Sequence, residues 1–453
     1  MLLKTLLVTS LLSLFAISEI KAEPLSIDQL WQSETFLKSY TTSYGVDSRI
    51  EPLINEEESE FLTELTERLS GDDKEEALEE MKASELVEAS PAILFAMGNF
   101  HFEKEKPEVA IEYFEKAIAL FPNFRDAHRN VAMLKLQKPD YKGAETHLRK
   151  AIELGSQEGL TYGLLAYCHS QNGRHQAALS AYRMAQVTMP EEMQWRLGEA
   201  YTLQTLGEAN QASSIYAELL KQSPYNLSLW INQANACLQS GKKSQAIAHL
   251  EMAKRISQLN PTNHAILGQL YLGESLPDKA LQNFQAAIKD KSAAFSLAVN
   301  CLGHLTNHQQ WSPAKQLGKE IDQRFSEEIS KKASRDLISK YSRSMAMVEL
   351  ETGNAKAGAK RIETLLETHP NDGDALLLLA RFREDNNEPE KAMVLLEKAA
   401  GIPEKRAAAL LAHGKILADL FRYDEALVLL EEAKTLKPTA SLTNYIEAIR
   451  DLN

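Results

Sequence analysis

The sequence predicts an all-α protein, a superhelical solenoid of about ten helix-turn-helix units with extra helices before it and a capping helix after it. Three observations predict this fold. Small residues recur every 34 positions through most of the 453-residue chain. A second small residue precedes nearly every one of them by twelve positions, and a proline often follows by twelve. No stretch alternates apolar and polar residues with the period of two that is typical of strands.

The repeat is defined by ten anchor positions. The first seven follow one another at a constant spacing, and after one offset three more follow at the same spacing: Ala110, Ala144, Ala178, Ala212, Ala246, Ala280 and Ala314, then Gly358, Ala392 and Ala426. After each of the first six, a bulky residue stands at plus four and an alanine or leucine at plus seven. These offsets share one helical face, so each anchor is expected to begin the buried stripe of a second helix.

The residue twelve positions before the anchor belongs to a first helix. It is small in nine of the ten units: Gly98, Ala132, Ala166, Ala200, Ala234, Gly268, Ala346, Ala380 and Gly414, with Leu302 as the exception. Small residues on both helices let the two axes approach closely. Five prolines then end units, because proline cannot continue a helix: Pro122, Pro190, Pro224, Pro370 and Pro438.

This register resembles the tetratricopeptide repeat (TPR), a helix-turn-helix unit of about 34 residues. The resemblance implies a right-handed solenoid in which each unit contacts its neighbours, so a long chain needs no single core. It also implies a binding scaffold, and we find no nucleophile, phosphate-loop or metalloprotease motif that would indicate an enzyme.

Residues 1–22 are expected to be a signal peptide. Lys4 supplies the positive start, Leu6 to Ile17 form an apolar run, and Ala22 offers a small residue at the cleavage site. The run is shorter than the ~20 apolar residues that span a bilayer. We therefore expect a periplasmic protein that begins at Glu23 and does not span the membrane.

Residues 23–90 are predicted to be an aromatic and acidic helical segment. Its first part carries Leu30, Trp31, Phe36, Leu37, Tyr40 and Tyr44. One helix should follow Asn55 and end at Ser70, and a second should be capped by Asp73. Ser90 and Pro91 should then begin the first full unit.

The negative charge is concentrated in this segment. Residues 47–88 hold sixteen Asp and Glu against four Lys and Arg, whereas the repeats from residue 89 onward sum to zero. A neutral array lacks the basic surface that nucleic acid or anionic lipid requires. We expect a protein partner and no nucleic acid.

The array itself is expected in two blocks. Residues 91–318 form the first block of repeats, 319–345 a helical insertion, and 346–453 the second block with its capping helix. The insertion adds ten residues to one period and contains no Gly or Pro between Lys319 and Tyr341, so we expect it to lengthen a helix.

The cysteines are expected to be free, and no cofactor or metal is expected. Cys168, Cys237 and Cys301 fall in repeats that are not adjacent, which is too far apart for a disulfide. Cys301, His304 and His308 do share one helical face, so a metal or small-ligand binding protein stays an alternative. Against it, Cys301 occupies a core position and no fourth ligand is evident.

The predicted binding site is the concave groove. In the TPR family the first helices line this groove, and positions five and nine of the repeat commonly contact an extended peptide. Transferred by register, these pairs are Phe95 and Asn99, Arg129 and Met133, Gly163 and Tyr167, Leu197 and Tyr201, Ile231 and Asn235, and Ala265 and Gln269. No repeat has the Lys–Asn pair that clamps an acidic tail in co-chaperones. The alternative that some of these tyrosines only pack between repeats stays open.

A narrower resemblance concerns the segment before the array. Residues 36–40, 44–46 and 50–52, which read FLKSY, YGV and IEP, are similar to the same region of periplasmic TPR proteins associated with TonB energy-transduction systems of Gram-negative bacteria. The resemblance implies a non-enzymatic adaptor in such a system. A scaffold for assembly of the cell envelope is the alternative within the same class.

Overall fold

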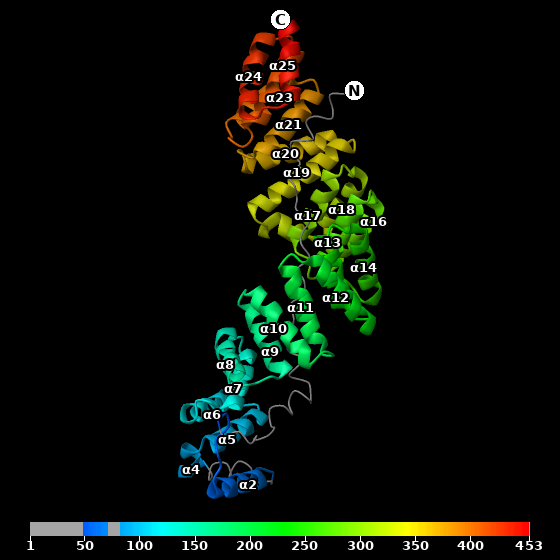
Figure 1. The fold of residues 1–453 in the computed structure, drawn as a ribbon. Coiled ribbons are helices and arrows are strands. Elements are labelled where there is room, and N and C mark those ends of the chain that lie inside the picture. The colour runs from blue at the N-terminus through cyan, green and yellow to red at the C-terminus, as the bar shows by residue number, and fades with distance from the viewer. Residues whose placement is uncertain (1–48, 71–81, 453) are drawn as a thin grey trace. The chain divides into compact units, whose positions relative to one another are not determined.

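The computed structural model describes residues 49–70 and 82–452, and these residues form helices joined by turns, with no strand among them. This part of the chain divides into two compact units. The N-terminal unit contains the described residues up to Met252, and the C-terminal unit those from Ala253 onward. The boundary falls inside α14 (Lys243–Ile256). The predicted all-α class is confirmed (Figure 1).

Ten helix pairs follow one another within the described residues, as the ten anchors predict. The first helices are α5 (Pro91–Glu103), α7 (Arg125–Gln137), α9 (Gly159–Gln171), α11 (Met193–Thr205), α13 (Leu227–Gln239), α15 (Pro261–Gly273), α17 (Phe295–Asn307), α19 (Arg335–Glu351), α21 (Gly373–Asp385) and α23 (Arg406–Asp419). The second helices are α6 (Pro107–Leu120), α8 (Tyr141–Glu153), α10 (His175–Thr188), α12 (Ala209–Gln222), α14, α16 (Pro277–Lys289), α18 (Trp311–Arg324), α20 (Ala355–Thr368), α22 (Pro389–Ala400) and α24 (Tyr423–Leu436).

The small residues let the two helices of a pair approach closely. All ten anchors are buried. The Phe114 ring of α6 lies against Gly98 of α5, where an added Cβ would meet the ring at 2.5 Å. Phe284 and Gly268 repeat this arrangement in the C-terminal unit, again at 2.5 Å. A phenylalanine at plus four therefore requires a glycine on the facing helix.

The elements before the array begin with α2 (Glu56–Ser70), as predicted. The Asn55 side chain accepts a hydrogen bond from the Glu58 amide at 2.9 Å, and the Glu58 carboxylate accepts one from the Asn55 amide at 2.8 Å. This reciprocal capping box fixes the start of the helix. The short α4 (Glu85–Ala89) follows, and Ser90 caps α5 as predicted. The helix predicted after Asp73 begins outside the described residues, as do the aromatic stretch and the signal peptide.

The insertion is helical but is not a single lengthened helix. The first helix α19 has 17 residues, whereas the other first helices have 13 or 14. Most of the remaining extra residues form a separate π-helical turn, η4 (Glu328–Lys332), between α18 and α19. The predicted lengthening is therefore found only in α19.

The seventh pair, α17 and α18, reverses the usual size pattern. Leu302 stands where other first helices have a small residue, and Gly318 stands four positions after the anchor Ala314. The Met345 sulfur of α19 occupies the space that a Cβ of Gly318 would need. The next first helix thus supplies the bulk that the second helix lacks.

The array ends on α25 (Ala440–Leu452), which is the predicted capping helix. It buries Leu442, Ile446 and Ile449 in the core of the last pairs. Among the described residues, no helix is both long enough and apolar enough to cross a bilayer. Cys168, Cys237 and Cys301 are free and buried.

Two histidines of the second pair form a hydrogen bond with each other. His128 of α7 and His147 of α8 bring their Nδ1 atoms to 2.9 Å, and His128 Nε2 lies 3.0 Å from the Pro122 carbonyl. Because a carbonyl only accepts, Nε2 of His128 carries the proton, and its Nδ1 accepts from His147. Burial, then the His128 charge and Lys135, lower the pKa of His147 to about 4, against weaker opposing effects of Glu115 and Asp140. Burial also lowers the pKa of His128, and Lys150 adds to this effect while the bond to Pro122 opposes it.

This pair should make the fold sensitive to acid. In the unfolded chain His147 takes up a proton near pH 6.5, but in the folded chain it does so only near pH 4. Its stabilising contribution is therefore complete above pH 6.5 and is lost as the pH falls toward 4. Solvent screening at this half-buried site reduces the full effect, so we expect a loss of about 1 kcal/mol between pH 7 and pH 5.

The His147→Gln variant should lose less stability over this pH range, whereas His308→Gln, at an exposed position, should behave as wild type. Hydrogen exchange of the α7 and α8 amides at both pH values measures this. Equal acid sensitivity in wild type and His147→Gln would contradict the assignment.

Candidate functional site

The predicted groove residues of the first pair are mostly packed. Phe95 is buried, with its ring 5.3 Å from Phe114 and 4.7 Å from Phe124. Asn99 is half-buried, and its side-chain oxygen accepts a hydrogen bond from the side-chain amide of Asn130 at 3.1 Å. Asn99 is therefore the more accessible of the two.

In the second pair, Arg129 is buried and donates two hydrogen bonds to Glu158, at 2.9 and 3.0 Å. Met133 has no exposed surface. In this conformation Met133 cannot contact a partner.

Two aromatic residues of the third and fourth pairs, Tyr167 and Trp195, pack between repeats. Tyr167 is buried, and its ring meets that of Tyr141 edge to face at 5.8 Å. Gly163 is covered by the Trp195 indole, which an added Cβ would meet at 2.5 Å. Tyr201 is half-buried. Tyr167 therefore packs between repeats, which is the alternative to a contact with a bound peptide.

In the fifth pair Asn235 is buried. The sixth pair lies in the C-terminal unit, where Gln269 of α15 is half-buried and faces α17. Ile231 and Ala265 are buried as well, whereas Leu197 is half-buried. Of the twelve residues in the six predicted pairs, Asn99, Leu197, Tyr201 and Gln269 therefore keep the most accessible surface.

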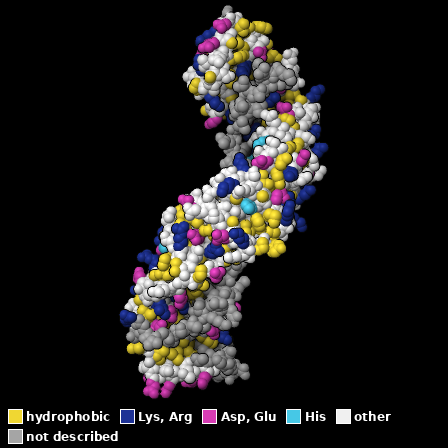
Figure 2. Space-filling model, turned by 45° about the vertical axis from the view of Figure 1, so that its right-hand side comes forward, with side chains coloured by type: hydrophobic (Ala, Val, Ile, Leu, Met, Phe, Trp, Pro, Cys, Tyr) yellow, Lys and Arg dark blue, Asp and Glu magenta, His cyan; other side chains and the backbone are white. Residues whose placement is uncertain are grey.

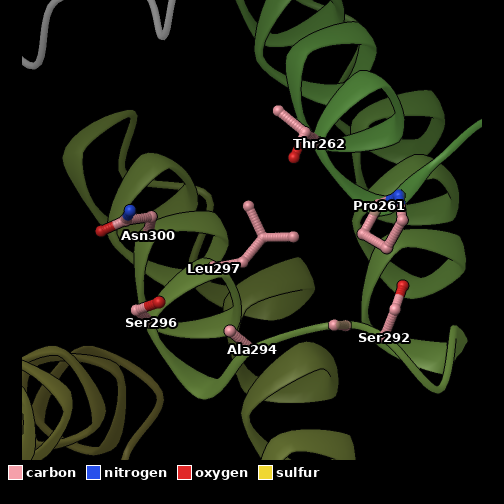
Figure 3. Close-up of a pocket in the computed structure, with 8 residues that line it drawn as sticks. Pro261, Thr262, Ser292, Ala294, Ser296, Leu297 and Asn300 are labelled. Atoms are coloured by element: carbon pink, nitrogen blue, oxygen red, sulfur yellow. The ribbon is translucent and has the colours of Figure 1, made fainter. Parts of the chain in front are cut away.

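An open pocket lies between the starts of α15 and α17 (Figure 3). Its volume is about 360 Å³. Its lining residues are Pro261, Thr262, Ser292, Ala293, Ala294, Ser296, Leu297 and Asn300. A narrower space of about 30 Å³ shares Thr262, Leu297 and Asn300 and extends between the same helices to Gln269 and His304. The pocket thus opens on the first helices of two neighbouring repeats.

The pocket lining combines one leucine and three smaller apolar residues with small polar ones. Leu297 points from α17 into the space toward α15, where Thr262 faces it. Thr262, Ser296 and Asn300 are exposed, and none of the lining residues is charged. Hydroxyl and amide groups beside a leucine suit a ligand that offers both backbone hydrogen-bonding groups and an apolar side chain.

The loop before α17 is held by a local turn. Asp290 accepts hydrogen bonds from the Ser292 hydroxyl at 2.6 Å and from the Ser292 amide at 2.8 Å. The two bonds from Ser292 lower the pKa of Asp290, so the carboxylate stays ionised. Gln258 also donates to Asp290, at 3.4 Å. These contacts position Ser292 at the pocket.

Of the residues around the pocket, the repeat register predicts Gln269 but not Thr262, Ser292, Ser296, Leu297 or Asn300. Ser292 lies in the loop before α17. The other four lie on first helices, but at repeat positions other than five and nine. A signal was present in the run Ser292, Ala293, Ala294 and Ser296, because four small residues around one phenylalanine leave space beside a helix start.

The structure does not assemble the metal site considered for Cys301, His304 and His308. Cys301 is buried, and burial raises the pKa of its thiol to about 12. His304 stacks on Phe284 with a centroid distance of 6.3 Å, and burial, then His308, lower its pKa to about 4. Within residues 49–70 and 82–452, no three His, Cys, Asp or Glu side chains are arranged to hold a metal ion.

Family models of the tetratricopeptide repeat match residues 91–124, 197–261 and 344–406. The first match coincides with the pair α5 and α6 and the turn that follows it. The other two cover parts of the fourth to sixth and of the eighth to tenth pairs.

Several solved structures are similar to this chain at low identity. A TPR protein from Parabacteroides merdae is 16% identical, with a TM-score of 0.36, and the match covers 55% of this chain and 98% of that one. PilF of Pseudomonas aeruginosa is 14% identical, with a TM-score of 0.37 and coverages of 50% and 98%. Yeast Tom70 is 14% identical, with a TM-score of 0.35 and coverages of 80% and 96%.

The family matches fall on helix pairs whose anchors recur at the constant spacing of the repeat. Sequence models and helix arrangement therefore agree on the repeat unit. The chain therefore contains tetratricopeptide repeats.

Proposed function

We propose that the chain is a non-catalytic scaffold that holds an uncharged, extended segment of another protein on its first helices. The observation that carries this proposal is the pocket of about 360 Å³ between α15 and α17. Repeats of this family suit protein binding because stacked first helices present an extended surface.

The chemistry of the pocket favours a peptide segment. Asn300, Ser296 and Thr262 can exchange hydrogen bonds with a peptide backbone, and Leu297 offers an apolar contact for one partner side chain. No charged side chain lines the pocket, so an acidic tail finds no cation there. The expected ligand is therefore a neutral segment with one apolar anchor.

The charges of the array support a protein over a nucleic acid. On the face shown in Figure 2, acidic and basic side chains are interspersed along the repeats, and acidic ones gather at the α2 end. The repeats from residue 89 onward carry no net charge. Nucleic acid binding requires a concentrated basic surface.

We further propose a periplasmic location and an adaptor role in a TonB system. The location is supported by the charged and apolar pattern of residues 1–22 and by Ala22. The TonB role is supported by the resemblance of residues 36–52. Assembly of the cell envelope is the alternative role for the same scaffold.

Site-specific photocrosslinking in intact Gram-negative cells tests these proposals together. A photoreactive phenylalanine replaces Asn300 in the pocket or, as a matched control, Asn444, an exposed asparagine on α25. We expect a protein adduct from position 300 that disappears with Leu297→Arg, and no such adduct from position 444. The purified product should begin at Glu23.

Adducts of equal yield from both positions, or none from position 300, would contradict the site. A product that begins at Met1 would contradict export but would leave the site standing.

A further inference from the structure

The space between α15 and α17 has a counterpart in the N-terminal unit, which the chain fills with its own side chain. There, position five of one first helix faces position three of the next, and these residues are Gly163 of α9 and Trp195 of α11. The Trp195 indole is fully buried, and an added Cβ at Gly163 would meet it at 2.5 Å. A large ring therefore occupies the space between these two first helices.

In the sixth and seventh repeats, the residues at the same two positions are Ala265 and Leu297. Leu297 points from α17 toward α15 (Figure 3), but a leucine side chain is much smaller than an indole. Position five is also small here, whereas most other repeats of the first block carry a larger residue: Phe95, Arg129, Leu197, Ile231 and Val299. The narrow space of about 30 Å³ is lined by both Ala265 and Leu297. It exists because neither position carries a residue that is large enough to fill it.

The size of this narrow space limits what can enter it from the open pocket. One water molecule needs a cavity of roughly 10 to 15 Å³, and a methyl group is only slightly larger than a water molecule. The wall, which includes Ile266 and Cys301, is almost entirely apolar, so methyl groups suit it better than water does. The space therefore fits one or two methyl groups, and an aromatic ring is too large for it.

The far end of the space carries no charge that would attract a charged group. Gln269 and His304 lie there. Burial, then His308, lower the pKa of His304 to about 4, so its imidazole is neutral at pH 7. A charged side chain would lose its hydration in this space without gaining a partner of opposite charge.

We propose that the anchor of the bound segment is a small aliphatic side chain, above all valine, whose methyl groups enter the space beside Ala265. The backbone of the segment stays in the open pocket, within reach of Thr262, Ser296 and Asn300. This inference rests on the proposed function and specifies the anchor that the pocket accepts. It excludes aromatic anchors by size and charged anchors by desolvation.

Peptide selection on the purified full-length protein tests the inference. The probe is a phage-displayed library of random peptides without cysteine. We expect the enriched peptides to share one small aliphatic residue, mostly valine, among uncharged neighbours. A shared leucine, methionine or aromatic residue would overturn the inference.

Changing the anchor in an enriched peptide tests the size limit without any change to the protein. One methylene group in an apolar pocket changes binding by about tenfold or more. We expect the peptide with alanine in place of valine to bind about tenfold more weakly, and the peptide with phenylalanine at least tenfold more weakly. Fluorescence polarisation of labelled peptides measures both affinities. Equal binding of the valine and phenylalanine peptides would overturn the inference.

A double variant of the protein tests whether the peptides use this space. Ala265→Gly with Leu297→Trp recreates the Gly163 and Trp195 pair, which the chain already accommodates in its N-terminal unit. We expect at least tenfold weaker binding of the valine peptide, because the indole fills the space. Leu452→Trp is the matched control, since it introduces the same ring at an exposed position of α25 and should bind as wild type. Circular dichroism verifies that both variants keep their helix content.

The outcomes separate this inference from the proposed function. If the double variant loses binding but the selected anchor is aromatic, the pocket holds the segment and only the inference about its anchor is wrong. If the folded double variant binds the valine peptide as wild type does, the peptide does not use the pocket, and this contradicts the proposed function as well.

Discussion

Replacing Phe114 by alanine is expected to destabilise the N-terminal unit by about 3 to 5 kcal/mol. The ring is fully buried between the two helices of the first pair and lies against Gly98 and Phe95. Its loss leaves a cavity that rigid neighbouring helices cannot close, and the first pair supports the pairs that stack on it. Hydrogen exchange of the α5 to α8 amides, read by mass spectrometry, measures the loss.

The Gly98→Ala variant isolates the geometric cause. The new Cβ would lie 2.5 Å from the Phe114 ring, so we expect a cost of about 1 to 3 kcal/mol. Adding Phe114→Leu should recover part of it, because three other repeats combine alanine with leucine at these positions: Ala132 with Leu148, Ala234 with Leu250, and Ala380 with Leu396. If the double variant loses more stability than the Gly98→Ala and Phe114→Leu variants lose together, glycine and phenylalanine are not matched in size.

The helix pairs could be predicted from the sequence because each is specified by several local signals that agree. An anchor, a bulky residue at plus four and a small residue at minus twelve fix both helices and their facing surfaces. The signals weaken where the size pattern changes. At Leu302 and Gly318 the missing bulk comes from Met345, a residue of the next repeat that no local pattern connects with them.

The turns inside the pairs could not be predicted from residue type. The residue two positions after the first helix is left-handed in every described repeat, but only Gly173, Gly207, Gly241 and Gly353 are glycines there. Phe421 has a φ of 60° and is 79% exposed. The packing of the two helices imposes this conformation even on a residue that disfavours it.

The candidate site could be predicted only in part, for a related reason. Register places Met133 and Gln269 at the same repeat position, yet Met133 is fully buried and Gln269 is half-buried beside the pocket. The accessibility of a first-helix residue depends on which side chains of neighbouring helices cover it. Register identifies the surface, and the three-dimensional structure identifies which parts of it are open.

The largest effect on binding is expected from Leu297→Arg. Leu297 lies at the centre of the pocket between α15 and α17, and it is the only large apolar side chain that points into it. A cation there must be desolvated to admit a partner and finds no acidic residue in the lining. Loss of a central anchor typically costs ~2 kcal/mol, which corresponds to about 30-fold weaker binding.

The most direct test of the scaffold proposal is therefore the affinity of the crosslinked partner for three purified proteins, measured by isothermal titration calorimetry. These are the wild type, Leu297→Arg, and Leu436→Arg, which makes the same substitution at an exposed position of α24. We predict about 30-fold weaker binding for Leu297→Arg and wild-type binding for Leu436→Arg, with equal helix content in all three. Wild-type affinity of Leu297→Arg would contradict the proposal that this pocket holds the partner.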